Sequence, residues 1–105
     1  MTPQQIIDLT AEITGIPREE ITSRCREFPI CKARNIAAWG IKRIRPTWSL
    51  IRIANELGMT DHGSARHALI RCLELYGSNA EFHEMVNKLK SAITKTKQPT
   101  RLAGQ

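Results

Sequence analysis

The 105-residue sequence lacks long apolar runs and alternating apolar patterns, and each absence excludes a class of protein. No stretch approaches the roughly 18 consecutive apolar residues of a membrane-spanning helix. The opening residues MTPQQIIDLT contain no basic flank followed by an apolar run, so we expect no export signal and a cytoplasmic location. No segment alternates with a period of two over the length of a strand, which argues against a β-sheet.

Cysteines are few, and their spacing excludes a structural zinc site. Cys25, Cys31 and Cys72 are an odd number, and none of them forms a close C-x-x-C pair. Free cysteine is often buried in soluble proteins. We therefore expect three reduced thiols, with Cys72 in the core.

Acidic residues are absent from two long segments of the chain. Residues 28–55 contain six basic residues and no acid, and residues 85–105 contain five basic residues and no acid. The rest of the chain is net negative, and the formal net charge of the whole is +6. Two basic blocks in acidic surroundings indicate an anionic partner, most often nucleic acid, although a solvated lysine face also explains the second block.

Apolar residues recur at helical spacing along the chain, which predicts an all-α fold. We expect a compact bundle of about six helices in one domain over residues 1–95, since the chain is too short for two domains. The basic tail over residues 96–105 contains too little apolar surface to fold, and it is expected to be disordered.

Local signals predict where the helices begin and end. Thr2 caps the first helix, with Gln5 completing a capping box, and Gly15 ends it. The segment REFPICKAR is expected to be a loop, because proline biases the preceding residue away from helix. The next helix is predicted from about Lys32 to Ile44, and the last from about Asn79 to Thr94.

Two short helices joined by a glycine turn predict a helix-turn-helix motif. They run over residues 49–57 and 61–76, and Gly58 ends the first of them. An apolar stripe at helical spacing marks the core face of the second helix: Ala65, Ala68, Leu69, Cys72, Leu73 and Tyr76. The outward side then carries His62, Gly63, Arg66, His67 and Arg71.

The second helix of such a motif lies in the major groove, and its N-terminal residues reach the base edges. Small residues such as Gly63 and Ser64 let the end of the helix approach the duplex closely. Asp61 accepts a hydrogen bond from a cytosine amine in this reading, or simply caps the helix. His62 contacts a guanine or a thymine methyl, or else is an ordinary surface histidine like His67.

A metal site built from Asp61, His62 and His67 is not expected. The five-residue spacing does not place both histidines on one face of a helix. No serine-histidine-acid set is indicated either, and the carboxylates are scattered. We expect no cofactor, no small-molecule substrate and no enzymatic activity.

From about Ile6 to Ile93, the chain resembles the C-terminal duplex-binding domain of the bacterial replication initiator DnaA. The resemblance is closest in the stretch GMTDHGSARHAL, where Gly58, Asp61, His62, Ser64 and His67 occupy the places of that family's signature. Further matches are an R-x-I-A run at residues 34–37, the pair Ser49-Leu50 and the order of six helices.

The resemblance implies a role for each matching position. The base-reading end is Asp61, His62 and Gly63, and the contacts with phosphates or flanking bases come from Ser64, His67 and Arg71, with Arg66 beside them. The basic loop and the start of the next helix, which reach the minor groove and the backbone, correspond to Lys32, Arg34 and Asn35. The other phosphate-touching positions are Lys42, Ser49, Leu50 and Ile51, the last two through main-chain amides.

The chain departs from the family at three positions. Gly63 stands where a threonine or serine is usual, Thr60 replaces a basic residue, and Phe28 replaces a minor-groove arginine. Loss of one or two good base contacts costs about 1–3 kcal/mol each, so the target is expected to differ from the usual initiator box. Phe28 packs under the loop or inserts at a base step.

No G-x-x-x-x-G-K-[ST] motif occurs, so ATP-driven opening of an origin is not expected of this chain. We expect a monomeric binding module for double-stranded DNA, of bacterial or phage origin, that regulates transcription or replication. The alternative is a protein-interaction adaptor that keeps the fold and has lost base reading.

Overall fold

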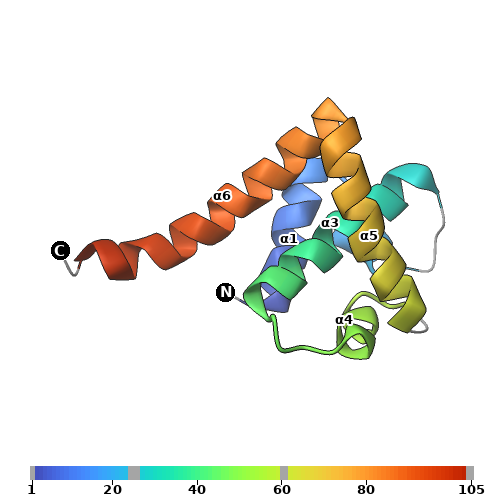
Figure 1. Cartoon of the computed structure of the whole chain (residues 1–105), viewed down its shortest axis with the longest axis horizontal. Coiled ribbons are helices and arrows are strands. Elements are labelled where there is room, and N and C mark those ends of the chain that lie inside the picture. The colour runs from blue at the N-terminus through green and yellow to red at the C-terminus, as the bar shows by residue number, and fades with distance from the viewer. Residues whose placement is uncertain (1, 24–26, 60–61, 104–105) are drawn as a thin grey trace.

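A computed structural model of the chain describes residues 2–23, 27–59 and 62–103, which form six α-helices and no strand (Figure 1). The helices are α1 (Pro3–Thr14), α2 (Arg18–Ile21), α3 (Phe28–Ile44), α4 (Leu50–Glu56), α5 (His62–Ser78) and α6 (Ala80–Ala103). The predicted all-α bundle is therefore confirmed. None of these helices, over the described residues, has the length and apolar character needed to span a membrane.

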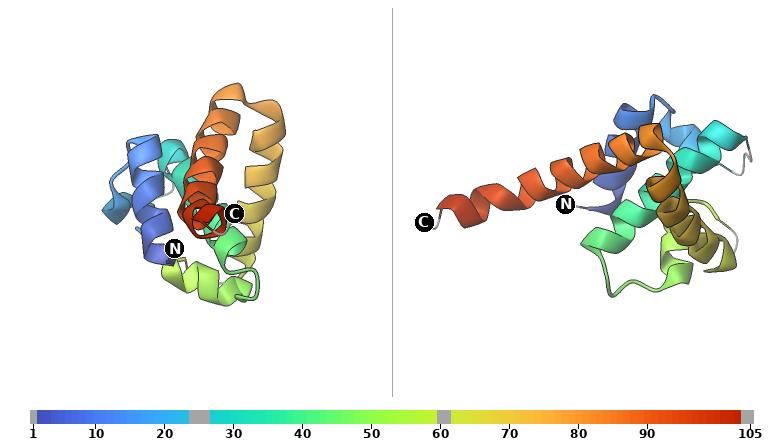
Figure 2. Two further views of the ribbon diagram at one scale, coloured as in Figure 1. Left: turned by 90° about the vertical axis from the view of Figure 1, so that its left-hand side faces the viewer. Right: turned by 45° about the horizontal axis from the view of Figure 1, so that its top comes forward.

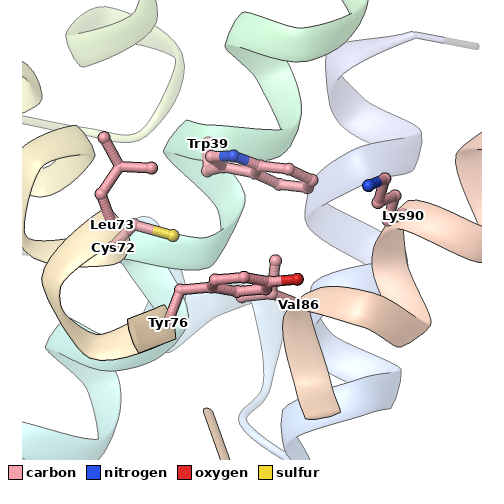
Figure 3. A pocket seen from close by; sticks show the side chains of 6 residues that line it. All are labelled: Trp39, Cys72, Leu73, Tyr76, Val86 and Lys90. Atoms are coloured by element: carbon pink, nitrogen blue, oxygen red, sulfur yellow. The ribbon is translucent and has the colours of Figure 1, made fainter. Parts of the chain in front are cut away.

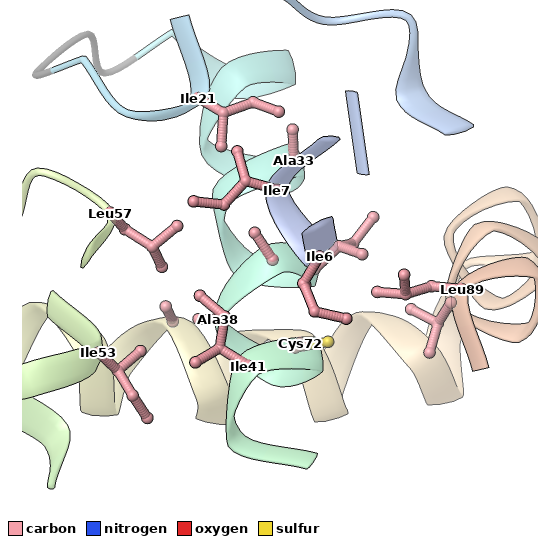
Figure 4. Close-up of a cluster of buried hydrophobic side chains, with 14 of the residues drawn as sticks. Ile6, Ile7, Ile21, Ala33, Ala38, Ile41, Ile53, Leu57, Cys72 and Leu89 are labelled. Carbon is pink, nitrogen blue, oxygen red and sulfur yellow. The ribbon is translucent and has the colours of Figure 1, made fainter. Parts of the chain in front are cut away.

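Helix α3 lies at the centre of the bundle and packs against each of the other five helices. Its fully buried residues Ala33, Ile36, Ala37, Ala38 and Ile41 form the middle of the core. The other helices cover them with side chains such as those labelled in Figure 4: Ile6, Ile7, Ile21, Ile53, Leu57, Cys72 and Leu89. The predicted burial of Cys72 is confirmed.

The predicted ends of α1 are also confirmed. The Thr2 side chain accepts a hydrogen bond from the Gln5 backbone amide, and the Gln5 side chain accepts one from the Thr2 amide. Gly15 ends the helix in the left-handed conformation, with φ of 75°. These signals are local, so they act in the same way whatever the rest of the chain does.

The expected loop before the third helix is wrong, because α3 begins at Phe28 rather than near Lys32. Pro29 occupies the first turn of α3, where its missing N–H is not needed and its fixed φ suits the helix. The Cys31 amide already donates to the Glu27 carbonyl at 2.9 Å. Lys32 and Arg34 consequently lie on a helix and not in a loop.

The apolar stripe predicted for α5 is correct except at Leu73, whose side chain is 65% exposed. Ala65, Ala68 and Cys72 are buried, and Leu75 is buried although it was not predicted to be. Leu73 follows Ala65 by eight residues, which turns it about 80° away around the helix. The buried face of α5 therefore extends from Ala65 around the helix in the direction opposite to Leu73.

Helix α6 packs on α1 and α5 with Phe82, Val86, Leu89 and Ile93 buried. Asn79 caps it, since its side-chain oxygen accepts a hydrogen bond from the Phe82 amide at 2.9 Å. The helix continues to Ala103, past the domain end expected at residue 95, and extends away from the bundle (Figure 1). The boundary between domain and tail stays a prediction.

Candidate nucleic-acid interface

Helices α4 and α5 pack against each other and form the two arms of the predicted helix-turn-helix. Ser49 begins α4 by accepting a hydrogen bond on Oγ from the Arg52 amide at 3.2 Å. At the other end, Gly58 has φ of 72°, and the Met59 amide donates to the Ala54 carbonyl at 2.8 Å. Gly58 thus reverses the chain after α4, as its position in the sequence predicted.

The outward face of α5 carries the polar residues that the sequence singled out. Gly63, Ser64, Arg66, His67 and Arg71 are all exposed, and the opposite face is held in the core. The presence of one glycine and one serine in the first turn leaves the backbone of that end thinly covered. The polarity and charge of this face suit contact with nucleic acid.

The structure does not describe the side chains of two of the predicted base readers, Asp61 and His62. Asp61 and the neighbouring Thr60 lie outside the described residues. His62 begins α5, and its side chain also lies outside the described part. Base reading by Asp61 and His62 therefore stays a prediction, and so does the capping role of Asp61.

Arg71 lies two turns further along α5 and forms an exposed ion pair. Its Nη1 lies 3.2 Å from Glu74 Oε1. Pairs of this kind in water contribute little to stability. The guanidinium can exchange the Glu74 carboxylate for a phosphate at small cost.

Arg34 holds together two segments of the fold. Its Nε donates to the Ile21 carbonyl at 2.8 Å, and one Nη donates to the Ser23 carbonyl at 2.6 Å. Ile21 is the last residue of α2 and Ser23 follows the helix, so the guanidinium satisfies acceptors at a helix end that lack intrahelical partners. The neighbouring Lys32 and Asn35 are half-buried on the same helix.

Lys42 also makes tertiary contacts. Its Nζ donates to the Pro46 carbonyl at 3.0 Å and to the Trp48 carbonyl at 3.2 Å, which closes the turn between α3 and α4. The lysine is half-buried. Of the two residues predicted to contact phosphates through main-chain amides, Leu50 is half-buried and Ile51 is 50% exposed.

Arg52 joins this basic surface although the sequence did not indicate it. Its guanidinium carbon lies 4.1 Å from the ring centroid of Trp48, which fixes the exposed side chain by a cation–π contact. The signal is the four-residue spacing of an aromatic and an arginine at the start of α4.

The first turns of α3 and α5 lie at the same end of the long axis of the molecule, on the right in Figure 1 and in the right-hand view of Figure 2. The C-terminal end of α6 lies at the opposite end. The structure therefore brings the first turns of α3, which contain Lys32 and Arg34, and the thinly covered end of α5 to the same end of the molecule, although they are about thirty residues apart in the sequence. No group of three His, Cys, Asp or Glu side chains within the described part could hold a metal ion.

Comparison with known proteins points to a single family. Residues 3–71 match the family model of the bacterial DnaA protein helix-turn-helix. The chromosomal replication initiator protein DnaA of Campylobacter concisus (strain 13826) is 31% identical over 90 residues, which cover 86% of this chain and 20% of that protein. The initiator DnaA of Picosynechococcus sp. is 28% identical over 91 residues, covering 87% of this chain and 20% of the relative. The chain thus spans about one fifth of the length of these curated relatives.

Proposed function

The chain belongs to the bacterial DnaA helix-turn-helix family, and from this premise we propose that it binds double-stranded DNA at specific sequences. Membership of the family implies DNA binding. We infer further that the start of α5 enters the major groove and that the start of α3 contacts the backbone and the adjacent minor groove. The protein then acts as a regulator of transcription or replication.

The observation that carries this proposal is the outward face of α5. Gly63, Ser64 and His67 are exposed on the first two turns, flanked by Arg66 and Arg71, while the helix is fixed behind them by its buried face. A rigid, thinly covered helix end with cations beside it suits close approach to base edges and phosphates. We assign base reading to Asp61 and His62. Gly63 follows them and separates them from the residues assigned to phosphate contacts.

The phosphate contacts in this proposal come from exposed and half-buried residues on three helices. We assign them to Ser64, His67 and Arg71 on α5, to Lys32, Arg34, Asn35 and Lys42 on α3, and to Ser49, Leu50 and Ile51 at the start of α4. Arg66 is exposed on α5 beside Ser64 and His67. The net charge of +6 supports attraction to a polyanion over the whole molecule.

We propose further that the protein acts as a monomer in solution, in the cytoplasm on the nucleoid, without a cofactor or enzymatic activity. The adaptor alternative makes the opposite prediction for DNA, because an adaptor that has lost base reading prefers no sequence.

The test is selection of bound duplexes from a random pool, followed by titration of the winning duplex at several salt concentrations. We expect one enriched motif and a steep loss of affinity with salt, with a log–log slope of about −0.9 for each phosphate contact. Enrichment of no motif, together with a flat salt dependence, contradicts the proposal and favours the adaptor.

Variants then separate the roles of the residues. His62→Ala is expected to change the preference at one or two base pairs, whereas Arg71→Ala weakens binding to all sequences and reduces the salt slope by about one. Lys88→Ala is the matched control, since Lys88 is an exposed cation on α6. If His62→Ala leaves the selected motif unchanged, the assignment of the reading end is wrong.

A further inference from the structure

A pocket opens between α3, α5 and α6, further along α5 than the candidate base-reading residues. Its volume is about 170 Å³. Figure 3 shows Trp39 on one side and Tyr76 on the other, with Leu73 at one end and Lys90 at the other. Cys72 and Val86 complete the lining.

We propose that this pocket binds an acidic segment of a partner protein, which inserts one large apolar side chain between Trp39 and Tyr76. The inference goes beyond DNA binding and does not rest on it. The pocket lies on the C-terminal half of α5, whereas the DNA-reading residues lie on its first turns.

The walls of the pocket are apolar and incompletely covered. Leu73 is 65% exposed, and Trp39 and Tyr76 are half-buried. The Tyr76 ring is held from behind, because its hydroxyl donates to Asn87 Oδ1 at 3.0 Å and the ring stacks on His83 with centroids 4.0 Å apart. A preordered pair of tryptophan and tyrosine side chains is typical of a binding hot spot.

The size of the pocket favours a single side chain over a free ligand. Pockets for small organic ligands have volumes of about 300–1,000 Å³, and this pocket is well below that range. One apolar anchor from a peptide uses such a space fully and leaves the flanking residues of the peptide on the surrounding surface.

The charge around the pocket selects an acidic segment. Two of its three walls come from the segments without acidic residues, 28–55 and 85–105. Lys90 lines the pocket, and the Arg43 guanidinium carbon lies 5.4 Å from the Trp39 ring centroid. The exposed acid next to Leu73 is Glu74, and it is paired with Arg71. Carboxylates beside the anchor of the partner therefore have Lys90 and Arg43 as ion-pair partners.

The charge and the apolar lining of the pocket disfavour two other occupants, which are a second copy of the chain and DNA. A second copy of the chain brings another net charge of +6 against these basic walls. DNA offers phosphates but no apolar side chain to fill the space between Trp39 and Tyr76.

The test is selection from a phage-displayed library of random peptides on the folded, full-length chain. We expect enriched peptides with one aromatic residue or leucine beside Asp or Glu. A synthetic peptide of that sequence should bind Leu73→Gln and Lys90→Glu about tenfold more weakly than the unchanged protein. The matched control is Ile70→Gln, because Ile70 is 46% exposed on the same helix but does not line the pocket. It should bind the peptide as the unchanged protein does.

Leu73 and Lys90 are exposed, so their variants should keep the circular dichroism spectrum and melting temperature of the unchanged protein. Enrichment of peptides without acidic residues overturns the proposal, and so does binding of the peptide to both variants as tightly as to the unchanged protein. A dimer in sedimentation equilibrium that is lost in Leu73→Gln overturns it in favour of a second copy. Loss of duplex binding in Leu73→Gln overturns it in favour of DNA.

Discussion

Gly58 lies so close to Thr22 that a Cβ added to the glycine would stand 2.1 Å from the Thr22 carbonyl oxygen. Thr22 follows α2, and Gly58 follows α4. The turn of the helix-turn-helix is therefore packed against the N-terminal part of the fold. Gly58 also has φ of 72°, in the region that side chains with a Cβ rarely adopt.

Replacing Gly58 by alanine is expected to destabilise the protein for both of these reasons. The left-handed backbone costs about 1–2 kcal/mol for a residue with a Cβ, and the clash with the Thr22 carbonyl forces the turn to move. We expect a total loss of about 2–4 kcal/mol in the free energy of unfolding, measured by urea denaturation.

Gly15→Ala separates the two causes. Gly15 has a similar φ of 75°, but an added Cβ there meets nothing within 4 Å. Only the cost of the left-handed backbone applies, so we expect a loss of about 1–2 kcal/mol. Equal losses for Gly15→Ala and Gly58→Ala would show that the contact with Thr22 contributes nothing.

Gly40 tests the packing at the centre of the bundle. A Cβ at this position of α3 would stand 2.7 Å from Ile6 Cγ2 and 2.9 Å from Leu89 Cδ2. Overpacking of this kind costs about 1–3 kcal/mol. Gly40→Ala should therefore lower the free energy of unfolding, measured by urea denaturation. Higher helix propensity of alanine acts in the opposite direction and reduces the net loss.

Gly77→Ala is the control for that propensity. Gly77 lies within α5, and an added Cβ there meets nothing within 4 Å. We expect a gain of about 0.5–1 kcal/mol in the free energy of unfolding, since alanine replaces glycine in an open helical position. A gain for Gly40→Ala as well would contradict the close approach of α3 to α1 and α6.

Local signals allowed much of the fold to be predicted. The capping box of Thr2, the left-handed Gly58 and the buried Cys72 follow from neighbours in the sequence or from helical spacing. Proline is more ambiguous, because Pro29 suits both a loop and a first helical turn. The exposure of Leu73 depends on which neighbour covers that flank of α5, and periodicity alone does not contain this information.

The candidate site was predicted less completely, for a related reason. The exposed face of α5 is a property of one helix, so its residues could be identified from spacing. The bonds of Arg34 with the Ile21 and Ser23 carbonyls depend on the path of the chain between α2 and α3. Sequence reasoning gave Arg34 a role toward DNA and could not reveal its contacts within the fold.

Cys72 should resist alkylation. Its side chain is 1% exposed, and burial raises the pKa of its thiol from the ordinary 9.0 to about 12. The thiolate is the reactive form, so iodoacetamide at pH 8 should modify the half-buried Cys31 well before Cys72, as measured by mass spectrometry of peptides. Similar rates under native conditions would mean that α5 opens readily; in urea the difference should disappear.

The same thiol makes stability depend on pH in the alkaline range. The unfolded thiol ionises near 9.0, whereas the folded thiol stays neutral up to about 12. Its contribution is complete below pH 9 and is lost as the pH rises toward 12, by about 1 kcal/mol at pH 10. The difference in urea midpoint between pH 8 and pH 10 should therefore be larger in the unchanged protein than in Cys72→Ala. Equal differences would contradict the raised pKa.

Arg34→Met is expected to destabilise the protein as well as to weaken DNA binding. Methionine keeps an apolar stem but removes the donors to the Ile21 and Ser23 carbonyls, and a half-buried acceptor left without its partner costs about 1–3 kcal/mol.

Arg66→Met is the matched control, since Arg66 is exposed on α5 and its loss should change the free energy of unfolding by less than about 0.5 kcal/mol. Both variants remove one positive charge, so any loss of duplex affinity common to them reports electrostatics. A larger loss of duplex affinity in Arg34→Met, at temperatures where this variant is fully folded, reports a further contribution of Arg34 to binding. An unchanged urea midpoint in Arg34→Met would contradict the role of Arg34 in joining α3 to the end of α2.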